Sequence, residues 1–182
     1  MTRFQRILNR LLLGWGIFCA GCLIVLAIAI AYQFGPGKVS TKTASNHDIR
    51  HVLNWSELGE ERTEEVLHSY IAASSFSGDS LEAHAIRISH VDKEELTQKE
   101  HGGGWFRGDK LTGVVADAMT FVGAEGLPSA EIPWFPTEQE LRSAEFYLYP
   151  WSIYYHGTKP TAVKLIFIQP EKKLVFYLAA KN

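Results

Sequence analysis

The chain has 182 residues, and its 18 Lys and Arg nearly balance 20 Asp and Glu, which gives a formal net charge of −2. A balance this even, without a basic block, lacks the electrostatic footprint of DNA or RNA binding, so we expect no nucleic-acid partner. Both cysteines, Cys19 and Cys22, fall in one apolar segment, so the rest of the chain has no thiol for a disulfide or a nucleophile.

The apolar segment is residues 11–32, which carry no charge and follow a basic head at residues 1–10 that contains Arg3, Arg6 and Arg10. A run of about 20 apolar residues predicts a helix that crosses a bilayer. Arginines before the run predict that the N-terminus stays in the cytoplasm. We therefore expect a signal anchor in the lipid bilayer and a single-pass membrane protein, most simply of a bacterial inner membrane, with a periplasmic or outward-facing domain.

Two other interpretations of this segment stay open. The small residues Ala29-Ile30-Ala31 fit a signal-peptidase site, although the run exceeds the roughly 7 to 15 residues of a signal-peptide core. Ala20-Gly21-Cys22 resembles the end of a bacterial lipobox, but the residues after Cys22 stay apolar. A retained anchor explains the length of the run better than either.

Small residues form a stripe along the predicted spanning helix. Gly16, Ala20, Ala27 and Ala31 are four, seven and four residues apart, which places them on one helical face. Such stripes let two helices approach closely. They indicate association with a membrane-protein partner or a homodimer.

Residues 33–45 read as a polar juxtamembrane linker, and residues 46–182 are long enough for one domain with its own core. The first predicted helix covers residues 60–74, because Val66, Leu67, Tyr70 and Ile71 form one apolar stripe. A strand is predicted at 81–90.

A short helix is then predicted from Asp92 to the glycines at 102–104. Apolar residues at helical spacing predict a helix over 109–122, and Thr137 with Glu140 has the spacing of a capping box.

The C-terminal third is rich in β-branched and aromatic residues. Strands are predicted at 144–155, 163–168 and 174–178, the last two joined by a short polar turn. Runs of helices and strands in this order predict an α+β domain, with an antiparallel sheet of about four strands packed against two or three helices.

Catalytic motifs are weak in this sequence. His47 and His51 are four residues apart with Asp48 between them, but no third ligand follows at a metal-binding spacing, so we predict no metal site and no cofactor. We predict no catalytic residue, and enzymatic activity is the less favoured interpretation. The alternative is a membrane-surface hydrolase that uses histidine with a carboxylate such as Asp48, Asp79 or Asp117.

Aromatic side chains in two segments are the better candidates for function. Trp134 and Phe135 lie in a proline-flanked loop, and Trp151 and Tyr154 lie in an aromatic strand. Packing in the core would explain them, but an aromatic surface would bind a partner or a ligand. We therefore expect a membrane-anchored protein whose domain binds a partner protein or a small ligand, as an accessory or envelope-complex subunit.

Overall fold

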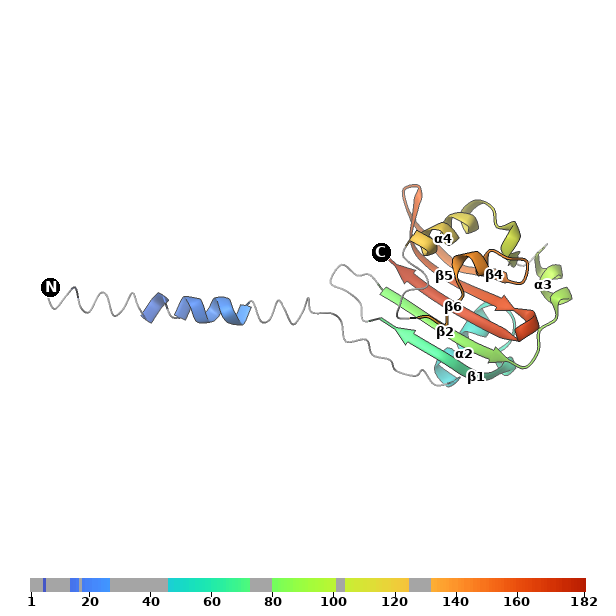
Figure 1. Cartoon of the computed structure of the whole chain (residues 1–182), viewed down its shortest axis with the longest axis horizontal. Helices are drawn as coiled ribbons and strands as arrows, with labels where there is room; N and C mark the ends of the chain where they lie inside the picture. Colours follow the sequence, from blue (N-terminus) through green and yellow to red (C-terminus); the bar gives the residue numbers. More distant parts are fainter. Residues whose placement is uncertain are drawn as a thin grey trace. The chain divides into compact units, whose positions relative to one another are not determined.

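The structure is a computed structural model that describes residue 5 and residues 14–16, 18–26, 46–72, 80–100, 104–124 and 132–182 (Figure 1). The chain divides into two compact units, Met1–Gly37 and Lys38–Asn182.

In the first unit, residues 14–16 and 18–26 are helical. A crossing helix needs about 20 consecutive apolar residues, and within the described ranges no helix is long and apolar enough to cross a membrane. The spanning helix predicted at 11–32, and with it the single-pass location and the periplasmic placement of the domain, is therefore wrong. Gly16 and Ala20 of the predicted association face are exposed on this helix, whereas Ala27 and Ala31 lie outside the described residues.

The second unit is built on one antiparallel sheet. Its strands are β1 (Thr63–Ile71), β2 (Ser80–Ile88), β3 (Phe106–Arg107), β4 (Tyr147–His156), β5 (Lys159–Gln169) and β6 (Leu174–Lys181). They lie in the order β1-β2-β6-β5-β4-β3. The predicted fold of about four strands is therefore wrong: the sheet has six, because β1 was predicted as a helix and the two-residue β3 adds a further edge.

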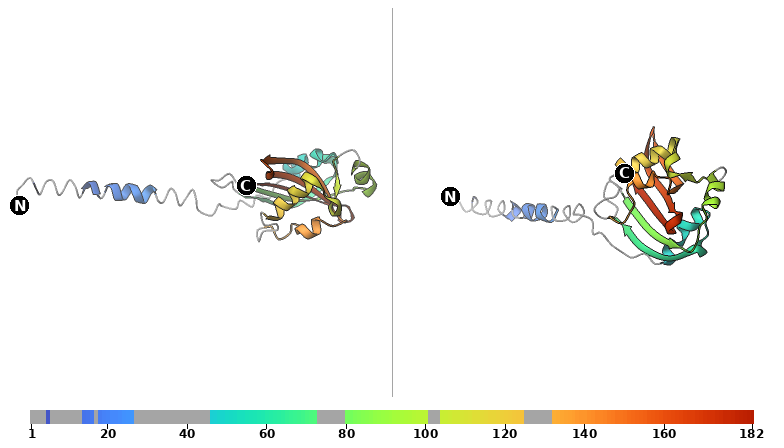
Figure 2. Two further views of the ribbon diagram at one scale, coloured as in Figure 1. Left: turned by 90° about the horizontal axis from the view of Figure 1, so that it is seen from above. Right: turned by 45° about the vertical axis from the view of Figure 1, so that its right-hand side comes forward.

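Helices cover both faces of this sheet. α2 (Asn46–Trp55) lies on one face, and α4 (Gly113–Ala124) and α5 (Glu138–Leu141) lie on the other, as the edge-on view on the left of Figure 2 shows. α3 (Lys93–Glu100) follows β2, with Leu96 in the core on the α2 side. We call the two surfaces of the sheet the α2 face and the α4 face.

Alternate residues of the central strands fill two separate cores. In β6, Val175 and Tyr177 enter the core under α2, whereas Phe176 and Leu178 enter the core under α4. This alternation follows from strand geometry, in which successive side chains point to opposite faces. Because both faces are covered, the middle of the sheet reads as nearly continuous hydrophobic sequence.

Two N-terminal elements differ from the sequence interpretation. Residues 46–55 form α2, although the first helix predicted for the domain from the sequence begins only at residue 60, and Ile49, Val52 and Leu53 of α2 are buried at i, i+3 and i+4. Residues 60–74 were predicted as a helix, but Glu60–Arg62 form a single 3-10 turn and residues 63–71 form β1. The predicted capping box is present: Thr137 accepts from the Glu140 N–H and caps α5.

Candidate functional site

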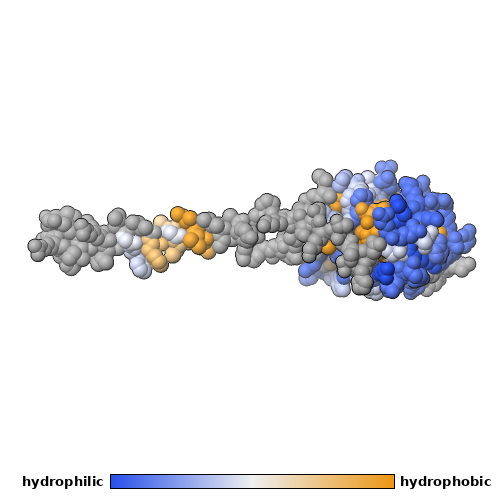
Figure 3. Space-filling view, turned by 90° about the horizontal axis from the view of Figure 1, so that it is seen from below, coloured by the Kyte–Doolittle hydropathy of each residue, from blue (hydrophilic) through white to orange (hydrophobic). Residues whose placement is uncertain are grey.

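The predicted binding residues form two groups on opposite faces of the sheet. Trp134 and Phe135 pack on the α4 face, whereas Trp151 lies on the α2 face against Trp55. Tyr154 shares that face, because it stands beside Ala162, two positions from Lys164. The sheet therefore separates the four predicted residues into two sites. On the face drawn in Figure 3, the described surface of the domain is mostly hydrophilic, with small apolar areas.

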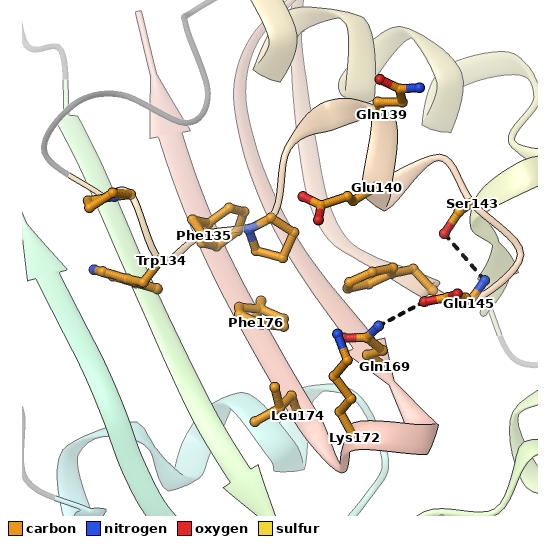
Figure 4. A pocket seen from close by; sticks show the side chains of 13 residues that line it. Trp134, Phe135, Gln139, Glu140, Ser143, Glu145, Gln169, Lys172, Leu174 and Phe176 are labelled. Atoms are coloured by element: carbon orange, nitrogen blue, oxygen red, sulfur yellow. Dashed lines mark hydrogen bonds between the residues drawn. The ribbon is translucent and has the colours of Figure 1, made fainter.

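The larger hollow is a pocket of 660 Å³ on the α4 face, which Figure 4 shows from close by. Its walls come from the segment 133–136, from α5, from the chain that enters β4, and from the turn between β5 and β6. The lining residues are Pro133, Trp134, Phe135, Pro136, Gln139, Glu140, Ser143, Glu145, Phe146, Gln169, Lys172, Leu174 and Phe176.

Aromatic rings form the floor of this pocket. Phe135 and Phe176 meet edge to face, with ring centroids 5.6 Å apart, and Phe146 and Phe176 are 6.2 Å apart. All three rings are buried. The Phe135 N–H donates to the Ile132 carbonyl at 2.9 Å, which closes the turn that directs this ring inward. The floor therefore offers an apolar surface fixed by the core beneath it.

Trp134 stands at the rim of the pocket. Its indole is half-buried and stacks on the imidazole of His68 in β1, with centroids 5.0 Å apart and planes 17° apart. The same indole meets Phe135 edge to face at 5.9 Å. Contacts on two sides hold the ring in place, and Pro133 and Pro136 restrict the backbone around it.

The acidic part of the rim begins with Glu140 of α5. Its Oε2 accepts from the Thr137 backbone N–H at 2.7 Å and from the Thr137 hydroxyl at 2.8 Å. The hydrogen bonds from Thr137 hold the pKa of the Glu140 carboxyl below its usual value. The carboxylate therefore stays ionised at neutral pH and points into the space beside Phe135 (Figure 4).

Three further polar residues complete the rim. Gln169 is buried, and its Nε2 donates to the Glu145 carboxylate at 3.0 Å. Lys172 extends from the β5–β6 turn toward Gln169 (Figure 4), and its charge also contributes to the lowered pKa of Glu140. Two carboxylates and one ammonium group thus border an aromatic floor, which leaves the pocket with an excess of one negative charge.

The second group surrounds Trp55 on the α2 face. Trp55 and Trp151 stack with centroids 5.0 Å apart and planes 6° apart, and the Lys164 ammonium lies 5.6 Å from the Trp55 centroid. His51 meets Trp55 edge to face. Trp151 and Tyr154 are 40% and 61% exposed, so this aromatic cluster reaches the surface.

A buried histidine lies next to that cluster. The Nε2 atom of His84 is 2.8 Å from Oε1 of Glu82, and the ring stacks on Tyr177. The hydrogen bond with His84 lowers the pKa of Glu82, while burial raises the pKa of Tyr177. Asp117 is an exposed residue of α4, on the opposite face from His84.

The metal and catalytic candidates of the sequence lie partly outside the part of the chain that the structure describes. No group of three His, Cys, Asp or Glu side chains there could hold a metal ion. Asp79 lies outside the described residues, as do Gly102 and Gly103, and the side chains of His47 and Asp48 are not described. Scans of protein families, curated proteins and solved structures found no match to this chain.

Of the residues that line the first pocket, the sequence analysis named Trp134 and Phe135 as candidates, and it did not point to the others. Phe146 and Phe176 lie in predicted strands. Their alternation with Tyr147 and Tyr177 predicts only that each phenylalanine lies on the opposite face of the sheet from its neighbouring tyrosine. Glu145, Gln169 and Lys172 lie in segments that meet only because β4, β5 and β6 are neighbours in the sheet. No local pattern marks them.

Proposed function

We propose that residues 46–182 form a binding domain, and that the pocket of Figure 4 receives an apolar group carrying a positive charge, on a partner protein or on a small ligand. The observation that supports this proposal is one combination: an aromatic floor bordered by two carboxylates and a single ammonium group.

The size and lining of the pocket suit binding. Ligand sites are typically concave, with volumes of about 300 to 1,000 Å³ and few polar groups around an apolar interior, and this pocket measures 660 Å³. Burial of an apolar group on Phe135, Phe146 and Phe176 supplies the favourable free energy. The polar rim supplies the preference between ligands.

Charge selects the ligand class. Glu140 is ionised at neutral pH because Thr137 hydrogen bonds lower its pKa. Glu145 keeps its position through the bond from Gln169. Since Lys172 offsets only one of these charges, an amine or guanidinium group gains from the rim and a carboxylate group loses.

The test is an NMR titration of the full-length, 15N-labelled protein with two probes of matched shape, 3-phenylpropylamine and 3-phenylpropionate. We expect the amine to shift the indole N–H resonance of Trp134, which is at the rim, and not that of Trp105, which is fully buried elsewhere. The Glu145→Gln variant should bind the amine about three- to fivefold more weakly, the usual loss for one exposed ion pair.

Glu94→Gln is the matched control, because it removes the same charge from the exposed face of α3. This control should leave the amine affinity unchanged. If the amine leaves the Trp134 resonance unmoved at millimolar concentration, or if the propionate binds this pocket equally well, the proposal is overturned.

A further inference from the structure

A second hollow lies on the α2 face, at the end of the sheet that α2 leaves uncovered. Its volume is 420 Å³, and it is lined by Ser80, Tyr154, Thr161, Ala162, Val163, Lys164, Ala179, Ala180 and Lys181. The strand register explains where it lies. Ser80, Lys181, Ala162 and Tyr154 stand side by side across β2, β6, β5 and β4.

The floor is low because two neighbouring strands carry alanine there. Ala179 of β6 pairs with Lys164 of β5, and Ala162 of β5 pairs with Lys181 of β6. Each alanine leaves space where the inner part of the sheet carries Tyr177 and Ile166. Tyr154, which is 61% exposed, forms a wall beside this floor.

The charges of this hollow are of one sign. Lys164 and Lys181 both line it, and its lining includes no acidic residue. Neither lysine forms an ion pair within the described part of the chain. The hydroxyl group of Ser80 adds a hydrogen-bond donor at its edge, whereas the Thr161 hydroxyl donates to the Tyr154 carbonyl at 3.4 Å.

We infer that this hollow is a second binding site, for a small carboxylate with a flat apolar body. The carboxylate lies between the ammonium groups of Lys164 and Lys181, and the apolar body rests on Ala162 and Ala179 against the Tyr154 ring. The Lys164 ammonium group lies 5.6 Å from the centroid of the Trp55 ring, which stacks on Trp151. The site is independent of the proposed pocket on the α4 face.

The opposite charge of the two hollows makes the inference testable with the same pair of probes. We expect 3-phenylpropionate to shift the backbone amide resonances of Ala162, Lys164 and Ala179 in the full-length protein, and to leave the Trp134 indole resonance in place. 3-Phenylpropylamine should not shift those three amides. The affinity for the propionate should fall as salt is added, because the attraction is between exposed charges.

Two variants test the chemistry. The double variant Lys164→Gln/Lys181→Gln should weaken propionate binding about tenfold, in line with the loss of charged hydrogen bonds. Lys110→Gln removes one positive charge from an exposed 3-10 turn that lines neither hollow, and should leave the propionate affinity unchanged. Ala179→Leu should abolish propionate binding by filling the floor, with circular dichroism to show that the sheet persists.

The inference fails if neither probe moves the three amides, if both probes move them equally, or if the double lysine variant keeps the full propionate affinity. A shift of the Trp134 indole by the propionate, with the Ala162 and Ala179 amides unmoved, would also overturn it. Failure of the proposed function would be seen elsewhere, in the response of the Trp134 indole to the amine on the opposite face of the sheet.

Discussion

His84 shows how an individual residue constrains this fold. Its imidazole is 1% exposed in the middle of a β-rich core, and only Nε2 has a partner, at 2.8 Å in Glu82. Nδ1 has none among the described residues, and the hydroxyl of Ser69, which occupies the register position opposite His84, is also buried without one. Unpaired buried polar atoms lower the stability of the fold. The hydrogen bond to Glu82 therefore offsets part of the free-energy cost of burying the His84 imidazole.

The Glu82→Gln variant should therefore be less stable in a pH-dependent way. Because the bond with His84 lowers the folded-state pKa of Glu82, the carboxylate stabilises the fold at neutral pH, and this contribution is lost as the pH falls through the lowered pKa. We expect the variant to lose up to about 1 kcal/mol at pH 7, a modest figure because the side chain is partly exposed.

Urea denaturation at several pH values measures this effect. The difference between the variant and the natural protein should shrink as the pH falls from about 4, the usual pKa of Glu in an unfolded chain, through the lowered pKa of Glu82 in the folded state. Glu94→Gln, on the exposed face of α3, should show no such convergence. A constant difference from pH 7 to pH 3 would contradict the ionic role of Glu82.

Gly108 is a second residue with a sharply defined role. A Cβ atom at this position would lie 2.2 Å from the Leu141 carbonyl oxygen and 2.5 Å from that of Ser143, both backbone atoms. The backbone from Leu141 to Ser143 can approach only because the side chain is absent, and Ser143 lines the first pocket.

We expect Gly108→Ala to lower the free energy of unfolding by about 2 kcal/mol or more, since backbone atoms cannot move aside easily. The comparison is Gly157→Ala, where a Cβ meets nothing within 4 Å but the φ of 64° is unfavourable. That variant should lose only about 1 to 2 kcal/mol. Equal midpoints in thermal unfolding would argue against the close approach at Gly108.

At the scale of elements, β1 explains the main error of the sequence interpretation. Its apolar residues, Val66, Leu67, Tyr70 and Ile71, do not alternate, because the pairing with β2 is irregular between Thr63 and Glu65 and again between Val66 and His68. Each irregularity shifts which residues face which side. The resulting pattern matches a helical stripe, and local sequence cannot distinguish the two.

Other elements follow closely from local sequence. The helix predicted at 109–122 is observed at 113–124, and the hairpin of β5 and β6 has the predicted polar turn. α2 was not predicted, although its buried Ile49, Val52 and Leu53 have i, i+3, i+4 spacing. Within residues 11–32, the structure describes residues 14–16 and 18–26, and these are helical.

The α5 capping box leads to a prediction at the same scale. α5 has only four residues, so the bonds between Thr137 and Glu140 hold a large part of it together. Thr137→Ala should lower the free energy of unfolding by about 1 kcal/mol, the usual cost of losing an N-cap. It should also weaken binding in the first pocket by freeing Glu140.

Chemical denaturation of Thr137→Ala beside Thr97→Ala checks this. The Thr97 hydroxyl donates to the Lys93 carbonyl inside α3, a bond that adds little to helix stability, so that variant should stay near the natural stability. If the two variants lose the same amount, the cap is not what holds α5.

At the scale of the whole molecule, the sheet divides two hollows of opposite charge. The first hollow has an aromatic floor and a rim in which carboxylates outnumber ammonium groups. The second has a floor of alanines and two lysines in its lining. Sequence reasoning named Trp134 and Phe135 together with Trp151 and Tyr154, but could not assign them to different sites. That assignment depends on strand order, which is set by pairings between segments far apart in the chain.

The strand order also has a consequence for how the chain acquires its structure. β6 lies between β2 and β5 in the sheet, although it is the last of these strands in the sequence. A nascent chain that ends before residue 174 therefore holds two separate β-pieces, the β1–β2 hairpin and the β3–β4–β5 set, with unpaired edges that β6 will later occupy. Pairing between such distant segments is slow, so we expect cooperative folding to wait for β6, and the open edges of β2 and β5 to need protection until then.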